Sequence, residues 1–121
     1  MDNKMKLTIA AFALKKISAK ILKKAKGIDF GASLDVIEDA MEVLYEASAI
    51  MDGEEGTMPA SEQVDLAWVK ARDVRDSIVN RCLSSVTREM VEVTDLIDQA
   101  LEYLEYEAGI QIPSGKKGEM K

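Results

Sequence analysis

Hydrophobic residues recur every three or four positions along most of the chain, the spacing that places side chains on one face of an α-helix. The first such segment predicts a helix from about Lys4 to Lys26, closed by Gly27, because glycine is common just beyond helix ends. Its expected buried stripe consists of Leu7, Ala10, Leu14, Ile17, Ile21, Ala25 and Ile28. Lysines occupy most of the opposite side, so this helix has one apolar and one basic side.

The second segment predicts a helix that begins at a Ser33 N-cap and ends at Gly53. Asp35 would then lie in the first turn, where the helix dipole favours an acid. The carboxylates of this helix share an arc of about 100°, and the remaining circumference is apolar or small, which favours a helix contacted from two sides. These carboxylates are Asp35, Glu38, Asp39, Glu42 and Glu46.

Residues 52–59 contain two glycines and end in Pro59, which is the pattern of a loop followed by the first residue of a helix. This third helix is expected to direct one stripe toward the core. The stripe consists of Val64, Ala67, Ala71, Val74, Ile78 and Cys82.

The hydrophobic spacing then continues unchanged from Val79 to Ala108, and two arrangements are compatible with it. In the first, Ser84 or Ser85 caps a separate fourth helix. In the second, a single helix spans residues 60–108 and dimerises as a coiled coil, giving three helices in all. We favour the first arrangement, an all-α up-down four-helix bundle, because it gives four helices of similar length.

The last helix is expected to end at Gly109, with Ile110 placed for the apolar contact that accompanies such an end. The predicted organisation is therefore a single helical domain over residues 1–112, followed by a flexible C-terminal tail over residues 113–121.

The chain has one cysteine, Cys82, and no histidine. This composition excludes an intrachain disulfide, the common thiolate or imidazole metal sites, and Cys-His or Ser-His nucleophile pairs. Because Cys82 falls on the third-helix stripe, we expect a small core residue rather than a reactive thiol. No cofactor is expected.

The apolar run of residues 7–14 is far shorter than the roughly 20 residues that span a bilayer, so we expect no transmembrane segment and a cytoplasmic location.

Charges of one sign are grouped along the chain. Residues 1–26 hold eight lysines and one acid, residues 27–69 hold eleven acids and no base, residues 70–88 hold five bases and two acids, and residues 89–115 hold seven acids and no base. Like charges one helical turn apart repel by up to about 0.5 kcal/mol per pair. Such grouping implies compensation, either by the basic helix lying beside acidic ones or by a binding partner.

The charged sides of the first two helices are candidate binding surfaces. The basic side, represented by Lys16, Lys20 and Lys23, can hold an anionic surface such as a lipid headgroup or a phosphate. Nucleic acid is an unfavoured partner because this helix carries no arginine for reading bases. The carboxylates from Asp35 to Glu46 can occupy a basic groove on a target.

Four apolar or aromatic residues fall outside the core stripes. Ile9 and Phe12 point with the lysines of the first helix, and Tyr103 and Tyr106 point away from the stripe of the last helix. Residues of this kind at helical spacing indicate a second buried surface. We therefore expect a protein partner or self-association as a homodimer or larger oligomer.

Two carboxylate pairs permit a catalytic hypothesis. Asp39 and Glu42 lie one turn apart on the second helix, and Glu62 and Asp65 lie one turn apart near the start of the third. This pattern resembles the paired carboxylates of the all-α nucleotide pyrophosphohydrolases, and the resemblance implies four groups that hold Mg²⁺ against a diphosphate. The pattern departs from that family because the first pair begins with Asp and the second pair lies at a helix start.

The function that the sequence favours is a non-enzymatic protein-interaction module, such as an inhibitor, an adaptor or a small assembly subunit, acting through charge-segregated helical faces. The alternatives are the Mg²⁺-dependent enzyme and a module that binds anionic surfaces or nucleic acid through the basic helix.

Overall fold

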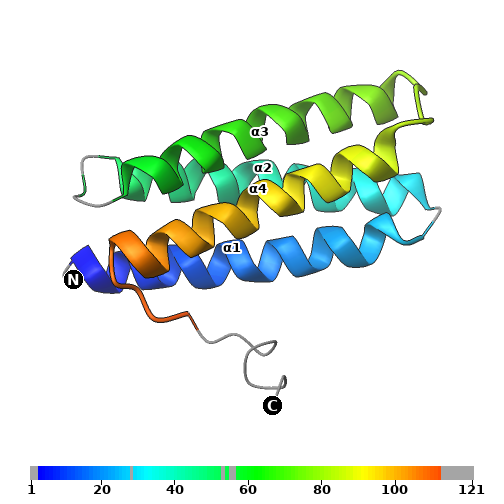
Figure 1. The fold of residues 1–121 in the computed structure, drawn as a ribbon. Helices are drawn as coiled ribbons and strands as arrows, with labels where there is room; N and C mark the ends of the chain where they lie inside the picture. Colours follow the sequence, from blue (N-terminus) through cyan, green and yellow to red (C-terminus); the bar gives the residue numbers. More distant parts are fainter. Residues whose placement is uncertain (1–2, 28, 53, 55–56, 113–121) are drawn as a thin grey trace, which may run out of the picture.

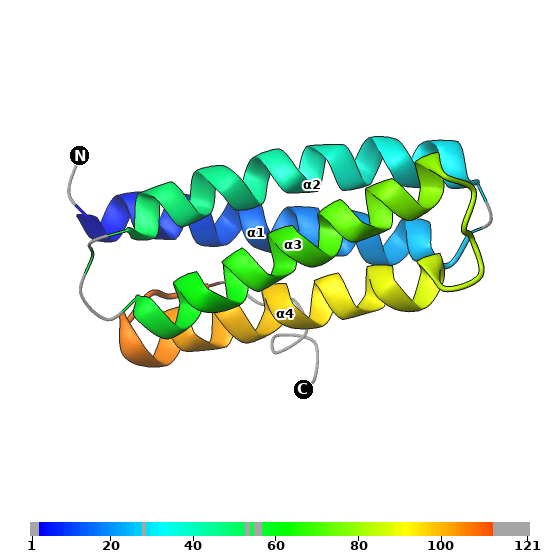
Figure 2. The same ribbon diagram turned by 90° about the horizontal axis from the view of Figure 1, so that it is seen from above.

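The structure is a computed structural model that describes residues 3–27, 29–52, 54 and 57–112. Within these residues the chain forms four helices: α1 (Asn3–Ala25), α2 (Phe30–Met51), α3 (Met58–Val79) and α4 (Val86–Glu107). Each helix runs antiparallel to the one before it, and α4 returns beside α1, so the helices form a closed ring (Figures 1 and 2). This arrangement confirms the expected all-α up-down four-helix bundle.

The core of the bundle is built from the predicted stripes. Leu14 and Ile21 of α1, Leu44 of α2 and Ile97 of α4 are fully buried. Alanines fill many of the other inward positions, which lets the helices approach one another closely. The buried alanines are Ala10, Ala11, Ala25, Ala40, Ala47, Ala60, Ala67, Ala71 and Ala100.

The start of α2 differs from the prediction. Asp29 is the N-cap, and its carboxylate accepts a hydrogen bond from the backbone N–H of Ala32 at 3.0 Å. Ser33 is instead a buried residue within the first turn, so the predicted Ser33 cap is wrong and Asp35 lies beyond that turn. The helix begins earlier because Phe30 packs against the core, which compensates for a glycine in the first turn. Position 28, predicted for the α1 stripe, lies outside the described residues.

The connection from α2 to α3 is organised by Thr57. Its hydroxyl donates to the carbonyl oxygens of Met51 and Glu54, at 2.9 and 2.7 Å. Pro59 is the second residue of α3, one position further in than predicted, and lies within the first turn where its fixed φ angle is favourable. The predicted end of α2 at position 53 falls outside the described residues, and the helix itself ends at Met51.

The chain breaks between α3 and α4, so the alternative of one helix over residues 60–108 is wrong. Arg81 has a left-handed φ of 64°, and the N–H of Cys82 donates back to the carbonyl of Ser77 at 2.8 Å. This turn leaves Cys82 exposed, so the predicted core position for this thiol is also wrong. Ser85 is the N-cap of α4, although its side chain makes no capping hydrogen bond.

The end of α4 follows the prediction. Gly109 has a φ of 70°, and the N–H of Ile110 donates to the carbonyl of Leu104 at 3.1 Å. Ile110 and Ile112 are buried, and their segment turns back along the bundle beside α1 (Figure 1). The predicted flexible tail, residues 113–121, lies outside the described residues.

Candidate protein-interaction surface

The exposed side of α1 carries a row of residues that changes from hydrophobic to basic. Successive members are four, three, four, four and three residues apart, a spacing that keeps them on one line along a helix. The row, called the α1 face below, consists of Met5, Ile9, Phe12, Lys16, Lys20 and Lys23. Met5, Ile9 and Phe12 are 55, 51 and 48% exposed, and all three lysines are exposed. Ile9 and Phe12 therefore point with the lysines, as predicted.

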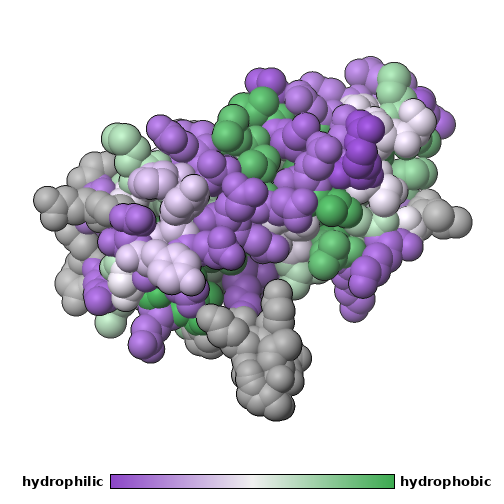
Figure 3. Space-filling view, viewed as in Figure 1, coloured by the Kyte–Doolittle hydropathy of each residue, from purple (hydrophilic) through white to green (hydrophobic). Residues whose placement is uncertain are grey.

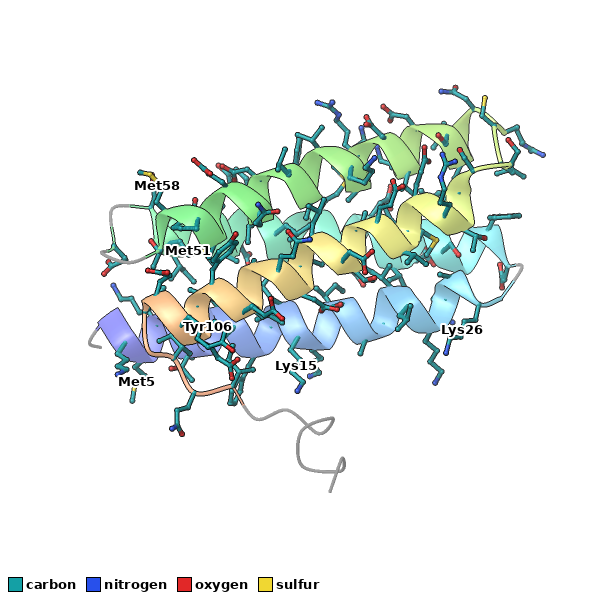
Figure 4. All side chains as sticks on the ribbon, viewed as in Figure 1. Met5, Lys15, Lys26, Met51, Met58 and Tyr106 are labelled. Carbon is teal, nitrogen blue, oxygen red and sulfur yellow. The ribbon has the colours of Figure 1, made fainter. Side chains whose placement is uncertain are left out.

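The hydrophobic half of the α1 face lies at the same end of the bundle as the last turns of α4. Figure 4 shows Met5 and Tyr106 toward this end of the bundle and Lys26 at the other. Tyr106 is 83% exposed and Tyr103 is 37% exposed, which agrees with their predicted positions outside the core stripe. Because α1 and α4 are antiparallel neighbours, the out-of-stripe residues predicted on each helix gather at one end of the molecule. On the side shown in Figure 3, hydrophilic side chains cover most of the surface and hydrophobic ones form separate patches.

Two lysines of the α1 face share a shallow groove with two carboxylates of α2. The groove has a volume of about 230 Å³ and contains Lys16, Lys20, Asp39 and Glu42 in its lining. Among the described residues, none of these four groups has an ion-pair partner within 4.0 Å. The basic helix does lie beside the acidic one, and the opposite charges face each other across solvent.

The predicted acidic residues form a continuous exposed surface along α2. This acidic face of α2 consists of Asp35, Glu38, Asp39, Glu42 and Glu46, all of them exposed. Three like-charged pairs in it, beginning at Asp35, Glu38 and Glu42, are four residues apart and repel one another. Within the described chain, the acidic face of α2 forms no ion pair within 4.0 Å that offsets this repulsion.

The second basic segment, residues 70–88, differs because four of its five basic side chains form ion pairs within 4.0 Å among the described residues, Arg81 being the exception. Lys70 of α3 contacts Glu92 of α4 at 3.0 Å, and Arg88 lies 3.8 Å from the same carboxylate. The hydrogen bond from Lys70, together with the positive charges of Lys70 and Arg88, holds the pKa of Glu92 below its usual value of 4.5. Two further pairs are formed within α3 by Arg72 with Asp73 and by Arg75 with Asp76.

A second groove, between α2 and α3, was not predicted. It has a volume of about 560 Å³, and its lining includes Tyr45, Trp68 and Val69. Tyr45 is 70% exposed, and the guanidinium of Arg72 lies 5.7 Å from the centre of the Trp68 ring. At the same seam the hydroxyl of Ser48 donates to the carboxylate of Asp65 at 2.7 Å. The sequence signal that could have indicated this groove was Tyr45, an aromatic residue that lies away from the α2 core stripe.

Comparisons with protein-family models, curated proteins and solved structures found no match. None of the described helices has the combination of length and hydrophobicity that crossing a membrane requires. The case for a function therefore depends on the chemistry of these surfaces.

The four carboxylates of the catalytic hypothesis do not line one groove, and the two hollows that Glu62 and Asp65 line adjoin each other through Asp52 and Ser61. Asp39 and Glu42 line the groove between α1 and α2, Asp65 lines the groove between α2 and α3, and Glu62 lines a hollow at the α2–α3 connection. Across the described residues, no group of three or more Asp, Glu or Cys side chains is arranged to hold a metal ion. The geometry gives no support to the resemblance with the pyrophosphohydrolases.

Proposed function

We propose that this protein is a non-enzymatic interaction module that binds a protein partner through the α1 face, as an inhibitor, an adaptor or an assembly subunit does. The observation that carries the proposal is the row of Met5, Ile9 and Phe12 on the outside of α1, each about half exposed. The inward-facing apolar stripe of the same helix is buried in the core. Covering such side chains is favourable by about 25 cal/mol per Å² of apolar area removed from water.

The lysines that continue the row suit a protein partner better than a nucleic acid. A phosphate backbone requires positive charge along its whole contact, whereas half of the α1 face is hydrophobic. Asp39 and Glu42 beside Lys16 and Lys20 also weaken the positive potential at that position. A partner surface with an apolar end and an acidic end matches both halves, and its charges would steer the encounter. The cytoplasm remains the compartment we expect for this interaction.

The proposal is tested by photo-cross-linking in the native host. Phe12 is replaced by a photoreactive benzoyl-phenylalanine, which keeps an aromatic ring at this position. The matched control carries the same group at Gln99, an exposed residue on α4. We expect a discrete cross-linked protein from position 12 and none from position 99, and loss of that product when Ile9→Asp is added. Equal labelling from both positions, or no product from position 12, would contradict an α1-face interaction.

A further inference from the structure

We infer that the partner on the α1 face is a second copy of this chain, which contributes its acidic face of α2 in a symmetric dimer. The two-fold axis would run parallel to the helices along the side of the bundle formed by α1 and α2. This inference rests on the proposed function, because it names the occupant of the same surface.

Charge is the first argument for a second copy. One side of the bundle presents a basic helix, α1, directly beside an acidic helix, α2. When two such sides meet about a two-fold axis parallel to the helices, α1 of each copy faces α2 of the other. Lysines then oppose carboxylates at both contacts. The exposed charges of the two faces, which form no ion pair within 4.0 Å inside the described part of one copy, would gain opposite charges from the other.

Register is the second argument. Rotation about an axis parallel to the helices leaves the height of every residue along the bundle unchanged. In one copy, Lys16 and Lys20 lie at the height of Asp39 and Glu42, because these four residues line one groove. In the dimer, Lys16 and Lys20 of one copy therefore lie level with Asp39 and Glu42 of the other, with no shift of one copy along the helix axis.

Under the same symmetry, the apolar half of the α1 face lies toward the C-terminal end of α2 in the other copy. Counting along the antiparallel pair from the shared groove, at the same rise per residue in both helices, places Ile9 of α1 level with Ile50 of α2. Ile50 is half-buried, and Ile9 is half exposed. By the same count Phe12 lies level with Glu46, so the apolar match is that of Ile9 with Ile50, and lysines oppose carboxylates from Lys16 onward.

The inference is tested with two charge-reversed chains. The first carries Lys16→Glu and Lys20→Glu, and the second carries Asp39→Lys and Glu42→Lys. Native mass spectrometry and sedimentation measure the mass of each chain alone and of a 1:1 mixture. The wild-type chain is expected at twice 13.3 kDa. Each variant alone is expected to self-associate at least about tenfold more weakly, since like charges meet at both symmetric contacts. Their mixture is expected to restore the dimer, because the remaining lysines of one chain then face the remaining carboxylates of the other.

The matched control for the first chain is Lys26→Glu with Arg81→Glu, which lowers the net charge by the same amount at exposed positions outside the α1 and α2 faces. It is expected to dimerise as the wild type does. Circular dichroism checks the fold of each chain. Should a reversed chain fail to fold, carbodiimide cross-linking of mixed ¹⁵N-labelled and unlabelled wild-type chains gives a second measurement. Peptides that join Lys16 or Lys20 of one isotope to Asp39 or Glu42 of the other are then expected.

A wild type that stays monomeric at about 100 μM overturns the inference, since a dimer with a Kd of about 1 μM would be largely formed at that concentration. The inference is also overturned if either charge-reversed chain dimerises alone as strongly as the wild type, or if their mixture stays monomeric. Cross-links that join only chains of the same isotope would overturn it as well. If the wild type is monomeric while position 12 cross-links a different protein in the host, this inference fails and the proposed function stands.

Discussion

Glu92 links α3 to α4 at the residue scale. Its carboxylate lies 3.0 Å from the ammonium of Lys70, and this hydrogen bond lowers the pKa of Glu92, assisted by the charge of Arg88. A carboxyl group with a lowered pKa in the folded state stabilises the fold above its unfolded pKa, and the contribution is lost as pH falls through the folded value. Because Glu92 is substantially exposed, solvent screens the pair and the effect is modest.

Glu92→Gln is therefore expected to lower the melting temperature at pH 7, where the wild-type carboxylate is charged. The difference between wild type and variant should shrink as pH falls below about 4.5, the usual value for this group. Thermal unfolding followed by circular dichroism between pH 3 and pH 7 measures it. Glu102→Gln, at an exposed α4 position with no ion pair within 4.0 Å among the described residues, is the control. If the difference in melting temperature between wild type and Glu92→Gln stays constant with pH, the Lys70 contact does not act through charge.

At the scale of a single helix, Asp29 of α2 and Ser85 of α4 are N-caps that differ in their hydrogen bonding. The Asp29 carboxylate accepts a hydrogen bond from the N–H of Ala32, whereas the Ser85 hydroxyl makes no capping hydrogen bond. Removing a functioning cap costs about 1 kcal/mol. We expect Asp29→Ala to lower the free energy of unfolding by that amount and Ser85→Ala to lower it by less than half as much. Urea unfolding of both variants measures the difference, and equal losses would contradict the capping geometry.

Helical periodicity predicted most of the elements because buried side chains recur on one face of each helix. Gly109 and Pro59 also predicted helix ends through their own backbone preferences, and Gly27 lies just beyond the end of α1 without a left-handed φ. The errors arose where tertiary packing overrides local preference. Phe30 extends α2 toward its N-terminus by packing against the core, and the left-handed Arg81 takes Cys82 out of a stripe whose spacing continues in the sequence.

At the scale of the whole molecule, the α1 face could be predicted because all its members lie on one helix, where spacing alone defines a line. The groove at Tyr45 and Trp68 could not, because its two sides come from α2 and α3. The sequence likewise could not show that Asp39 and Glu42 line a different groove from Glu62 and Asp65. Pairs one turn apart describe a single helix, and only the order of helices around the ring decides which pairs meet.

The spacing of the whole bundle is set by alanines at its inward positions. Ala67 is fully buried on α3, a helix that packs against both α2 and α4. Ala67→Leu adds three carbons at a fully buried position, so the helices are expected to separate or the leucine to adopt a strained rotamer. Overpacking of this kind costs about 1–3 kcal/mol. Ala49→Leu is the matched control, because Ala49 is exposed along the open groove between α2 and α3. Urea unfolding is expected to show the loss for Ala67→Leu and a change within about 0.5 kcal/mol for Ala49→Leu. If Ala67→Leu does not lower the free energy of unfolding, the alanine at position 67 does not set the distance between the helices.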